Sequence, residues 1–267
     1  MAINFPNIDP VLLSLGDTPF KVTWYSLSYV MGILLAHLYI KYLNRTGKIK
    51  SSINHSVIDG VLTYLILGII IGGRLGYVIF YDLDYNLANP LNIIRTWEGG
   101  MSFHGGLIGV ISAAFIYSYI HNIKYLRLMD LLACATPIGL FFGRIANFIN
   151  GELYGRKTDV SFGVIFPGQE FPRHASQLYE SFSEGLLLWI ILLLLYRFTK
   201  IQTYYGMLSG VFLLLYAFFR GLIENYREPD AHIGFVIYNY TMGQLLSFPM
   251  IIVGFSIILY SLKNKAK

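Results

Sequence analysis

The fold class of this chain is decided by the stretch Val57–Phe80, whose sequence is VIDGVLTYLILGIIIGGRLGYVIF. A hydrocarbon core of about 30 Å needs roughly 20 apolar residues in helical form, and this stretch is long enough to cross it. One basic residue, Arg74, interrupts its apolar run. The stretch therefore predicts a transmembrane helix that carries a charge a purely structural span does not need.

The rest of the chain repeats this pattern. Of its 267 residues 55% are hydrophobic and 13% charged, and its mean hydropathy is +0.55, outside the usual range for a soluble domain. We expect an all-α integral membrane protein with about seven transmembrane helices, forming a single polytopic membrane domain over residues 1–267. The expected spans are Trp24–Leu43, Val57–Phe80, Gly105–Ile120, Met129–Ile149, Tyr179–Phe198, Tyr205–Ile223 and Gly243–Leu262.

The loops between these spans predict the orientation, because lysine and arginine accumulate in cytoplasmic loops. One set of loops is richer in them, and it includes the C-terminal tail. We therefore expect the N-terminus outside and the C-terminus in the cytoplasm. The richer set holds Arg45, Lys48, Lys50, Lys124, Arg127, Arg197, Lys200, Lys263, Lys265 and Lys267, and the poorer set holds Lys21, Arg95, Arg156, Lys157, Arg173 and Arg227.

Two of the outward-facing loops, 81–104 and 150–178, are longer than ordinary connections, and loops of that length usually carry function or a small fold of their own. We expect 150–178 to be an outward-facing loop region, with a small extramembrane subdomain as the further hypothesis. Within it, Ser161–Phe171 (SFGVIFPGQEF) is a candidate for a short strand or hairpin.

Three arginines lie inside expected spans, where each costs at least about 2.5 to 3.5 kcal/mol at a helix centre. Arg74, Arg144 and Arg220 each come about three-quarters of the way along a span that runs outward, so we expect them at similar depth. One alternative is that each reaches the interface or pairs with a carboxylate to hold helices together. We favour a shared polar cavity, in which Arg220 pairs with Glu224, its i+4 neighbour, and Glu152 follows Arg144.

These arginines favour an anionic ligand, because a guanidinium group donates two parallel hydrogen bonds to phosphate and keeps its charge. A phosphate-bearing lipid is the natural ligand at that depth. His104, between glycine pairs in WEGGMSFHGGLIGV, is either a proton-transfer group or a hydrogen-bonding residue. Among the other histidines only His174, in PRHASQLYE, has a comparable context. Metal, nucleotide and serine-hydrolase motifs are missing from the sequence, so we expect no cofactor, no metal and no nucleic-acid partner.

Five ordered motifs resemble those of the prolipoprotein diacylglyceryl transferase family, over nearly the whole chain. They are GGRLGYVIFYD from Gly72, WEGGMSFHGGLIG from Trp97, GRIANFINGELYGR from Gly143, PRHASQLYE from Pro172 and RGLIENYREPD from Arg220. One position departs from the family pattern: Ala146 stands where the family often has glycine. The added methyl group tightens the surroundings of the motif without removing a reacting group.

This resemblance implies a multi-pass enzyme of the bacterial inner membrane with its active site toward the outer, periplasmic side. It implies transfer of the diacylglyceryl group of phosphatidylglycerol to the lipobox cysteine thiol of a prolipoprotein signal peptide, which forms a thioether and releases glycerol phosphate in the first step of lipoprotein maturation. Membrane lipid is the other partner. The implied catalytic residues are His104, Arg144 and Arg220, and the implied substrate-binding residues are Tyr25, Arg74, Arg144, Asn147, Glu152, Gly155, Tyr216 and Glu224. For Arg74 a purely structural role is the alternative.

The mechanism that follows is a hypothesis. The acceptor thiol loses its proton to His104, or to a carboxylate acting through water, and attacks the glyceryl carbon bonded to the phosphate ester oxygen. Arg144 and Arg220 stabilise the charge that grows on the departing glycerol phosphate. A transporter or channel with an arginine-lined anion path, and a lipid-binding scaffold without catalysis, are the rival functions.

Overall fold

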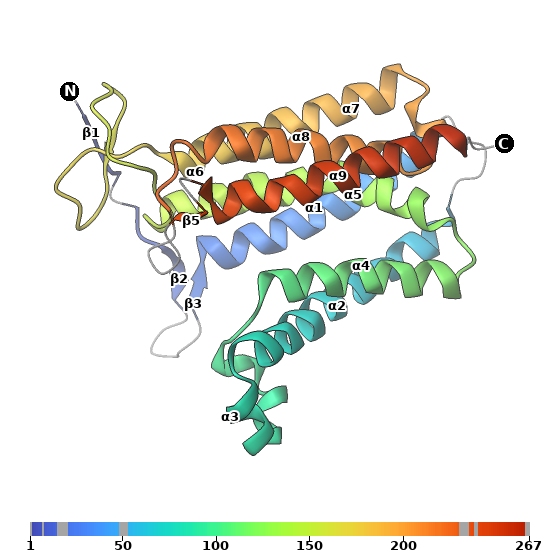
Figure 1. Cartoon of the computed structure of the whole chain (residues 1–267), viewed down its shortest axis with the longest axis horizontal. Coiled ribbons are helices and arrows are strands. Elements are labelled where there is room, and N and C mark those ends of the chain that lie inside the picture. Colours follow the sequence, from blue (N-terminus) through green and yellow to red (C-terminus); the bar gives the residue numbers. More distant parts are fainter. Residues whose placement is uncertain are drawn as a thin grey trace. The chain divides into compact units, whose positions relative to one another are not determined.

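The structure, a computed structural model, describes residues 2–6, 8–14, 21–47, 53–229, 235–237 and 240–264. Of the basic loop residues used above, Lys48, Lys50, Lys265 and Lys267 lie outside the described residues. The chain divides into two units (Figure 1). Unit 1 combines Met1–Lys50 with Asp130–Lys267, and unit 2 is Ser51–Met129. Each is described by itself below, and the expectation of a single domain over 1–267 stays a prediction.

Long apolar helices dominate both units, which confirms an all-α multi-pass membrane protein. Six helical stretches are long and apolar enough to span a bilayer. The seventh expected span, α8, is apolar but has only 17 residues, about 26 Å of helix, slightly less than the hydrocarbon core. The helices are α1 (Trp24–Thr46), α2 (His55–Tyr81), α4 (Phe103–Ile120), α5 (Tyr125–Ile149), α6 (Ser176–Glu180), η3 (Ser181–Leu187), α7 (Leu188–Phe198), α8 (Met207–Ile223) and α9 (Met242–Lys263).

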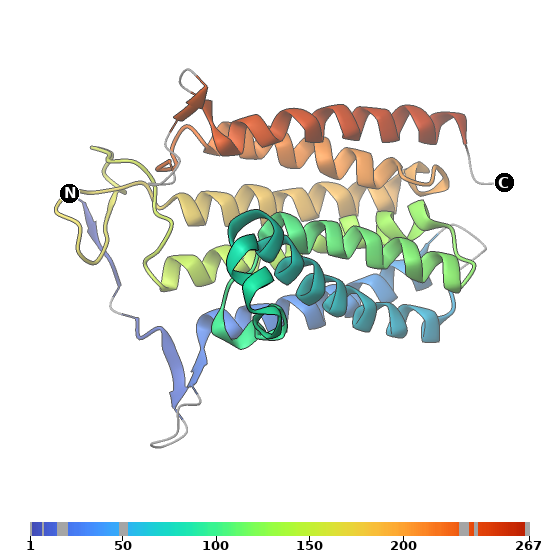
Figure 2. The ribbon, with the colours of Figure 1, turned by 60° about the horizontal axis from the view of Figure 1, so that its bottom comes forward.

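In unit 1, α8 begins at a fixed point on α5. Gly206 has a φ of 94°, which glycine tolerates without strain, and Asp130 accepts hydrogen bonds from the backbone nitrogens of Gly206 (2.7 Å) and Ser209 (2.8 Å). A carboxylate there satisfies two of the donors that a helix N-terminus leaves open and complements its dipole. The short η4 (Ile201–Thr203) precedes it, and α9 packs along α8 (Figures 1 and 2).

The helix formed by α6, η3 and α7 contains a π-helical segment, η3, which lies against α5. The Ser181 hydroxyl donates to the carbonyl of Phe141 (3.1 Å), and a Cβ added at Gly185 would come within 2.7 Å of the Phe141 Cβ. Such segments widen a helix locally and are frequent at functional sites. Here the segment places Glu180 and Glu184 in the interior of unit 1, where they are 1% and 0% exposed.

Unit 2 is built around a close packing of α2 on α4. Gly72 and Gly76 face Gly105 and Gly109, and an added Cβ at any of these four positions would overlap backbone of the other helix. Small residues four apart let two helix backbones approach closely, as is common in membranes. The 82–102 connection between the helices holds α3 (Leu83–Ala88), η1 (Pro90–Ile94) and η2 (Thr96–Glu98).

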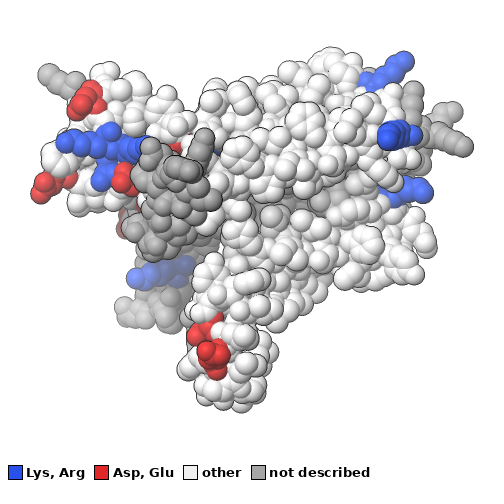
Figure 3. All heavy atoms as spheres, in the orientation of Figure 1, with Lys and Arg blue, Asp and Glu red and all other residues white. Residues whose placement is uncertain are grey.

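The 150–178 loop region has a small core of its own, formed by Val164, Phe166 and Ala175 with Phe5, Phe148 and Tyr154 packed against them. The strand expected within Ser161–Phe171 is confirmed as β4 (Val164–Ile165). Its partner is β1 (Ile3–Asn4), paired in parallel. Two hairpins complete the strands, β2 (Val11–Ser14) with β3 (Lys21–Thr23) and β5 (Phe235–Ile237) with β6 (Tyr240–Thr241). Over unit 1, Figure 3 shows basic groups at one end of the helices and charges of both signs over the loop region at the other.

Candidate active site

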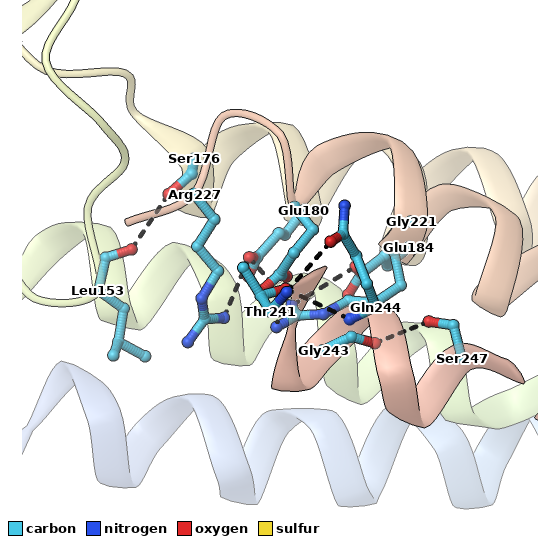
Figure 4. Close-up of polar contacts among 12 residues, drawn as sticks. Leu153, Ser176, Glu180, Glu184, Gly221, Arg227, Thr241, Gly243, Gln244 and Ser247 are labelled. Carbon is cyan, nitrogen blue, oxygen red and sulfur yellow. Dashed lines mark hydrogen bonds and ion pairs between the residues drawn. The ribbon is translucent and has the colours of Figure 1, made fainter. Parts of the chain in front are cut away.

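Three arginines of unit 1 converge on one buried carboxylate, that of Glu180. Arg144 of α5 reaches its Oε2 with Nε at 2.7 Å. Arg220 of α8 and Arg227, just after α8, reach its Oε1 at 3.1 and 3.3 Å (Figure 4). Glu180 is 1% exposed, so these contacts replace the water that a carboxylate otherwise requires. Glu180 therefore joins three segments of the chain at one point.

Arg220 is the most connected member of this cluster. Its Nη2 lies 3.1 Å from Oε2 of Glu224, so the i,i+4 pair predicted from the sequence is confirmed. Its Nη1 lies 3.8 Å from Oε1 of Glu184, beyond hydrogen-bonding distance. Gly243, in the first turn of α9, leaves room for Glu224, because a Cβ there would lie 2.7 Å from Glu224 Oε2. We call Arg144, Arg220, Arg227, Glu180, Glu184 and Glu224 the arginine–carboxylate cluster.

The exposed edge of the cluster is cationic. The side chains of Arg144, Arg220 and Arg227 are 17%, 14% and 11% exposed, whereas the three glutamates are exposed by 5% or less. Because the carboxylates lie behind the guanidinium groups, an approaching molecule meets hydrogen-bond donors and positive charge first. This arrangement suits an anion such as phosphate.

Four other predicted site residues lie in unit 1. Asn147, on α5, donates to Oε1 of Glu152 (2.8 Å). Tyr25 begins α1, its hydroxyl lies 3.2 Å from that of Tyr29, and it interacts electrostatically with Glu152 and Arg144. Tyr216, on α8, interacts electrostatically with Glu184 and Arg220. These side chains therefore surround the cluster from α1, α5 and α8.

Gly155 lies in the loop region and requires the absence of a side chain. Its nitrogen donates to the carbonyl of His174 (2.8 Å), and it pairs with Arg227 in an antiparallel bridge. An added Cβ would overlap the carbonyl oxygen of Tyr226 and lie 2.8 Å from the His174 Cβ. Gly155 thus ties the loop region to the segment that carries Arg227.

His174 lies beside the cluster's loop and lines an apolar cavity of about 480 Å³ together with Tyr179 and Tyr226. Its Nδ1 is 3.2 Å from the Tyr179 hydroxyl. Partial burial lowers the pKa of His174 below its ordinary value, because desolvation disfavours the imidazolium form. His174 is therefore held in its neutral form.

Arg74 and His104 belong to unit 2. The Arg74 guanidinium donates to the carbonyls of Asn92, Ile93 (2.9 Å), Gly99 (2.6 Å) and Gly100 (3.1 Å), so it holds the 90–100 connection. These contacts support the structural alternative for Arg74. His104 is the second residue of α4, beside the Phe103 ring. A cavity shared by all three arginines stays a prediction.

Sequence reasoning did not single out Glu180, Glu184 or Arg227 as site residues. A signal was present, because Glu180 and Glu184 are two carboxylates one helical turn apart in an expected span. Arg227 follows Arg220 by seven residues, in a segment assigned to the loop. That all three belong to one cluster depends on how α5, α6 and α8 face one another.

Comparison with known proteins gives the family. The profile of the family described as "Prolipoprotein diacylglyceryl transferase" matches residues 10–260. The chain belongs to the prolipoprotein diacylglyceryl transferase family. Proteins called phosphatidylglycerol–prolipoprotein diacylglyceryl transferase in Rickettsia felis and Rickettsia akari are both 50% identical to it over 260 residues, 97% of this chain and 99% of each relative. The same name belongs to a Rickettsia canadensis protein, 50% identical over 258 residues, 96% of this chain and 98% of the relative. The match to the diacylglyceryl transferase family includes all the members of the arginine–carboxylate cluster.

Proposed function

We propose that this chain transfers the diacylglyceryl group of phosphatidylglycerol to the thiol of a lipobox cysteine in a prolipoprotein, forming a thioether and releasing glycerol phosphate. The observation that carries the proposal is the arginine–carboxylate cluster, with its guanidinium groups exposed and its glutamates buried. We place the enzyme in the bacterial inner membrane with this cluster toward the outer side, as the loop charges predict.

In this mechanism Arg144 and Arg220 bind the phosphodiester of the lipid. The thiolate attacks the glyceryl carbon, a carbon–sulfur bond forms, and the bond from that carbon to the phosphate ester oxygen breaks. The departing group gains negative charge during the displacement, so fixed guanidinium donors stabilise the transition state more than the bound lipid. Glu180 holds both arginines in place before the lipid binds, at 2.7 and 3.1 Å.

The thiol must lose a proton to become the nucleophile, because the thiolate is the reactive form. We assign this proton to His104, with a carboxylate acting through water as the alternative acceptor. Substituting His104 by glutamine removes the titratable group and keeps a hydrogen-bonding side chain. A loss of about 10²-fold or more in transfer rate supports the assignment, and full activity would reduce His104 to a positioning role.

The supporting residues act on position. Asn147 and Glu152 form a hydrogen-bonded pair next to Arg144 in sequence, and Tyr25 interacts electrostatically with Glu152 and Arg144. We propose that they, with Tyr216 and Glu224, shape the headgroup site, and that Gly155 keeps the loop close to Arg227. Arg74 supports the connection in unit 2.

The test is a transfer assay. Purified protein is placed in vesicles that contain phosphatidylglycerol and is given a peptide with a lipobox cysteine. We expect a peptide heavier by one diacylglyceryl group, detected by mass spectrometry, and no shift when serine replaces the cysteine. An unmodified peptide with folded protein that still binds the lipid would favour the scaffold function instead, and a shift that survives the serine substitution would contradict thiol transfer.

A further inference from the structure

Glu184 differs from the other carboxylates of the arginine–carboxylate cluster in its contacts. It lies on the π-helical segment η3 and is 0% exposed. Neither of its carboxylate oxygens accepts a hydrogen bond from any residue that the structure describes. Its ion-pair contact is Nη1 of Arg220 at 3.8 Å, while Glu180 and Glu224 each have an arginine nitrogen within 3.1 Å. Figure 4 shows Glu184 and Glu180 on the same stretch of helix.

An ionised carboxylate in such a position is costly, because a buried charge without hydrogen bonds has lost its hydration. Protonation removes that cost and creates an O–H donor. The titratable and charged groups around Glu184 come from every helix that packs near it: Glu180 on α6, Arg144 on α5, Arg220 and Tyr216 on α8, and Arg227 after α8. The charged residue of α7, Arg197, lies in its last turn, at the far end of that helix.

The charges of the cluster decide when Glu184 takes up a proton. With all three glutamates ionised, the three arginines are balanced and the cluster has no net charge. A lipid phosphodiester adds one negative charge that this neutral cluster does not compensate. A proton on Glu184 leaves the cluster with one positive charge, which matches the phosphodiester. Binding of the anion therefore favours the neutral form of Glu184.

We propose that Glu184 takes up a proton when an anionic phospholipid headgroup binds to the arginine–carboxylate cluster. This proposal rests on the proposed function for the identity of the lipid. By linkage, if headgroup binding promotes protonation, then protonation strengthens headgroup binding by the same factor. Glu184 thus makes the affinity for the anionic lipid depend on pH without itself contacting the reacting atoms.

Calorimetry tests this directly. A short-chain phosphatidylglycerol is titrated into the full-length protein in detergent, in two buffers of different ionisation enthalpy, because the difference in apparent heat counts the protons taken up. Between about pH 6 and about pH 9 we expect uptake in the wild type to rise toward about one proton per lipid bound. Over the same range Glu184→Gln, which is permanently neutral and of similar shape, should bind the lipid with no proton uptake.

Two controls separate the explanations. Glu228→Gln removes an exposed carboxylate paired with Arg173 at 3.0 Å, outside the cluster, and should keep the wild-type uptake. Short-chain phosphatidylcholine, whose headgroup has no net charge, should cause no uptake at any pH. Equal uptake by wild type and Glu184→Gln, or none by the wild type across the range, would overturn the proposal.

The outcome is independent of turnover. Transfer activity without proton uptake at Glu184 would leave the proposed function intact and remove this inference. Proton uptake at Glu184 on lipid binding, in a protein that transfers nothing to the peptide, would do the reverse.

Discussion

At the residue scale, the guanidinium fork of Arg220 is the feature that another cation cannot reproduce. Nη1 and Nη2 contact Glu180 and Glu224 separately, each at 3.1 Å. Lysine has one nitrogen on a flexible stem and cannot maintain both contacts while binding phosphate. We therefore expect Arg220→Lys to lower the transfer rate about 10²-fold.

Initial rates in phosphatidylglycerol vesicles measure this effect. The matched control is Arg197→Lys, in the last turn of α7 with an exposed side chain, which should transfer at the wild-type rate. A lysine enzyme at position 220 as active as this control would show that one positive charge is sufficient there.

Gly243 makes a second prediction at this scale. A Cβ at this position would lie 2.7 Å from Oε2 of Glu224, so Gly243→Ala should push Glu224 away from Arg220. Because a displacement of about 1 Å in a site can cost about 10²-fold, we expect a loss of ten- to a hundredfold in transfer rate. Gly221→Ala is the control, since a Cβ there meets no atom of the described residues within 4 Å. Equal rates for the two alanine variants would mean that the Glu224 position is unimportant.

The same residues show how far a sequence predicts a site. The Arg220–Glu224 pair was predictable because helical spacing alone places i and i+4 side by side. The meeting of Arg144, Arg220 and Arg227 on Glu180 was not, because it depends on the rotation of α5, α6 and α8 about their axes. Several contacts of Arg74 were also beyond prediction, since its partners are backbone carbonyls of an irregular connection.

At the element scale, the packing of α2 on α4 leads to a stability prediction. A Cβ at Gly72 would lie 2.8 Å from the Gly109 Cα on the facing helix, and backbone there cannot move aside as a flexible side chain can. Gly72→Ala should therefore destabilise the protein by about 1–3 kcal/mol. Thermal unfolding of the purified protein in detergent measures this as a lower midpoint.

Gly106→Ala provides the comparison within the same helix pair. Its Cβ would make an ordinary contact with the Ile69 carbonyl oxygen at 3.7 Å, so its unfolding midpoint should stay near that of the wild type. If the two alanine variants unfold at the same temperature, close glycine packing does not stabilise unit 2.

The π-helical segment η3 is the element that sequence patterns did not predict. Ser181–Leu187 reads as part of one apolar span, and nothing in its composition marks a change from α to π geometry. The change follows from tertiary contacts, because Ser181 donates to a carbonyl of α5 and Gly185 allows α5 to approach. The spans themselves were predictable, since apolar length is fixed by bilayer thickness.

At the scale of the whole molecule, the loop charges make a topology prediction. The single cysteine, Cys134, is buried, so an introduced cysteine reports its own position. We expect Asp159→Cys, at an exposed site in the loop region, to react with a membrane-impermeant maleimide in cells whose cytoplasmic membrane is intact. Lys124→Cys, between α4 and α5, should react after permeabilisation. The opposite pattern would place the arginine–carboxylate cluster on the cytoplasmic side.

Long-range pairing in the loop region shows what remained outside prediction at this scale. A short strand within 161–171 was expected from its β-favouring residues, but its partner, Ile3–Asn4, lies at the other end of the chain sequence. Parallel pairing of two-residue strands has no sequence pattern of its own. The family motifs predicted the enzyme class because they extend through both units.

The central claim is that exposed guanidinium groups of the arginine–carboxylate cluster stabilise the departing glycerol phosphate. The most direct measurement is the rate of diacylglyceryl transfer by Arg144→Ala and Arg220→Ala beside Arg197→Ala, with each variant confirmed as folded in the membrane. We predict losses of about 10²- to 10³-fold for the first two and none for the third. Transfer by Arg144→Ala or Arg220→Ala at the rate of Arg197→Ala would contradict the claim.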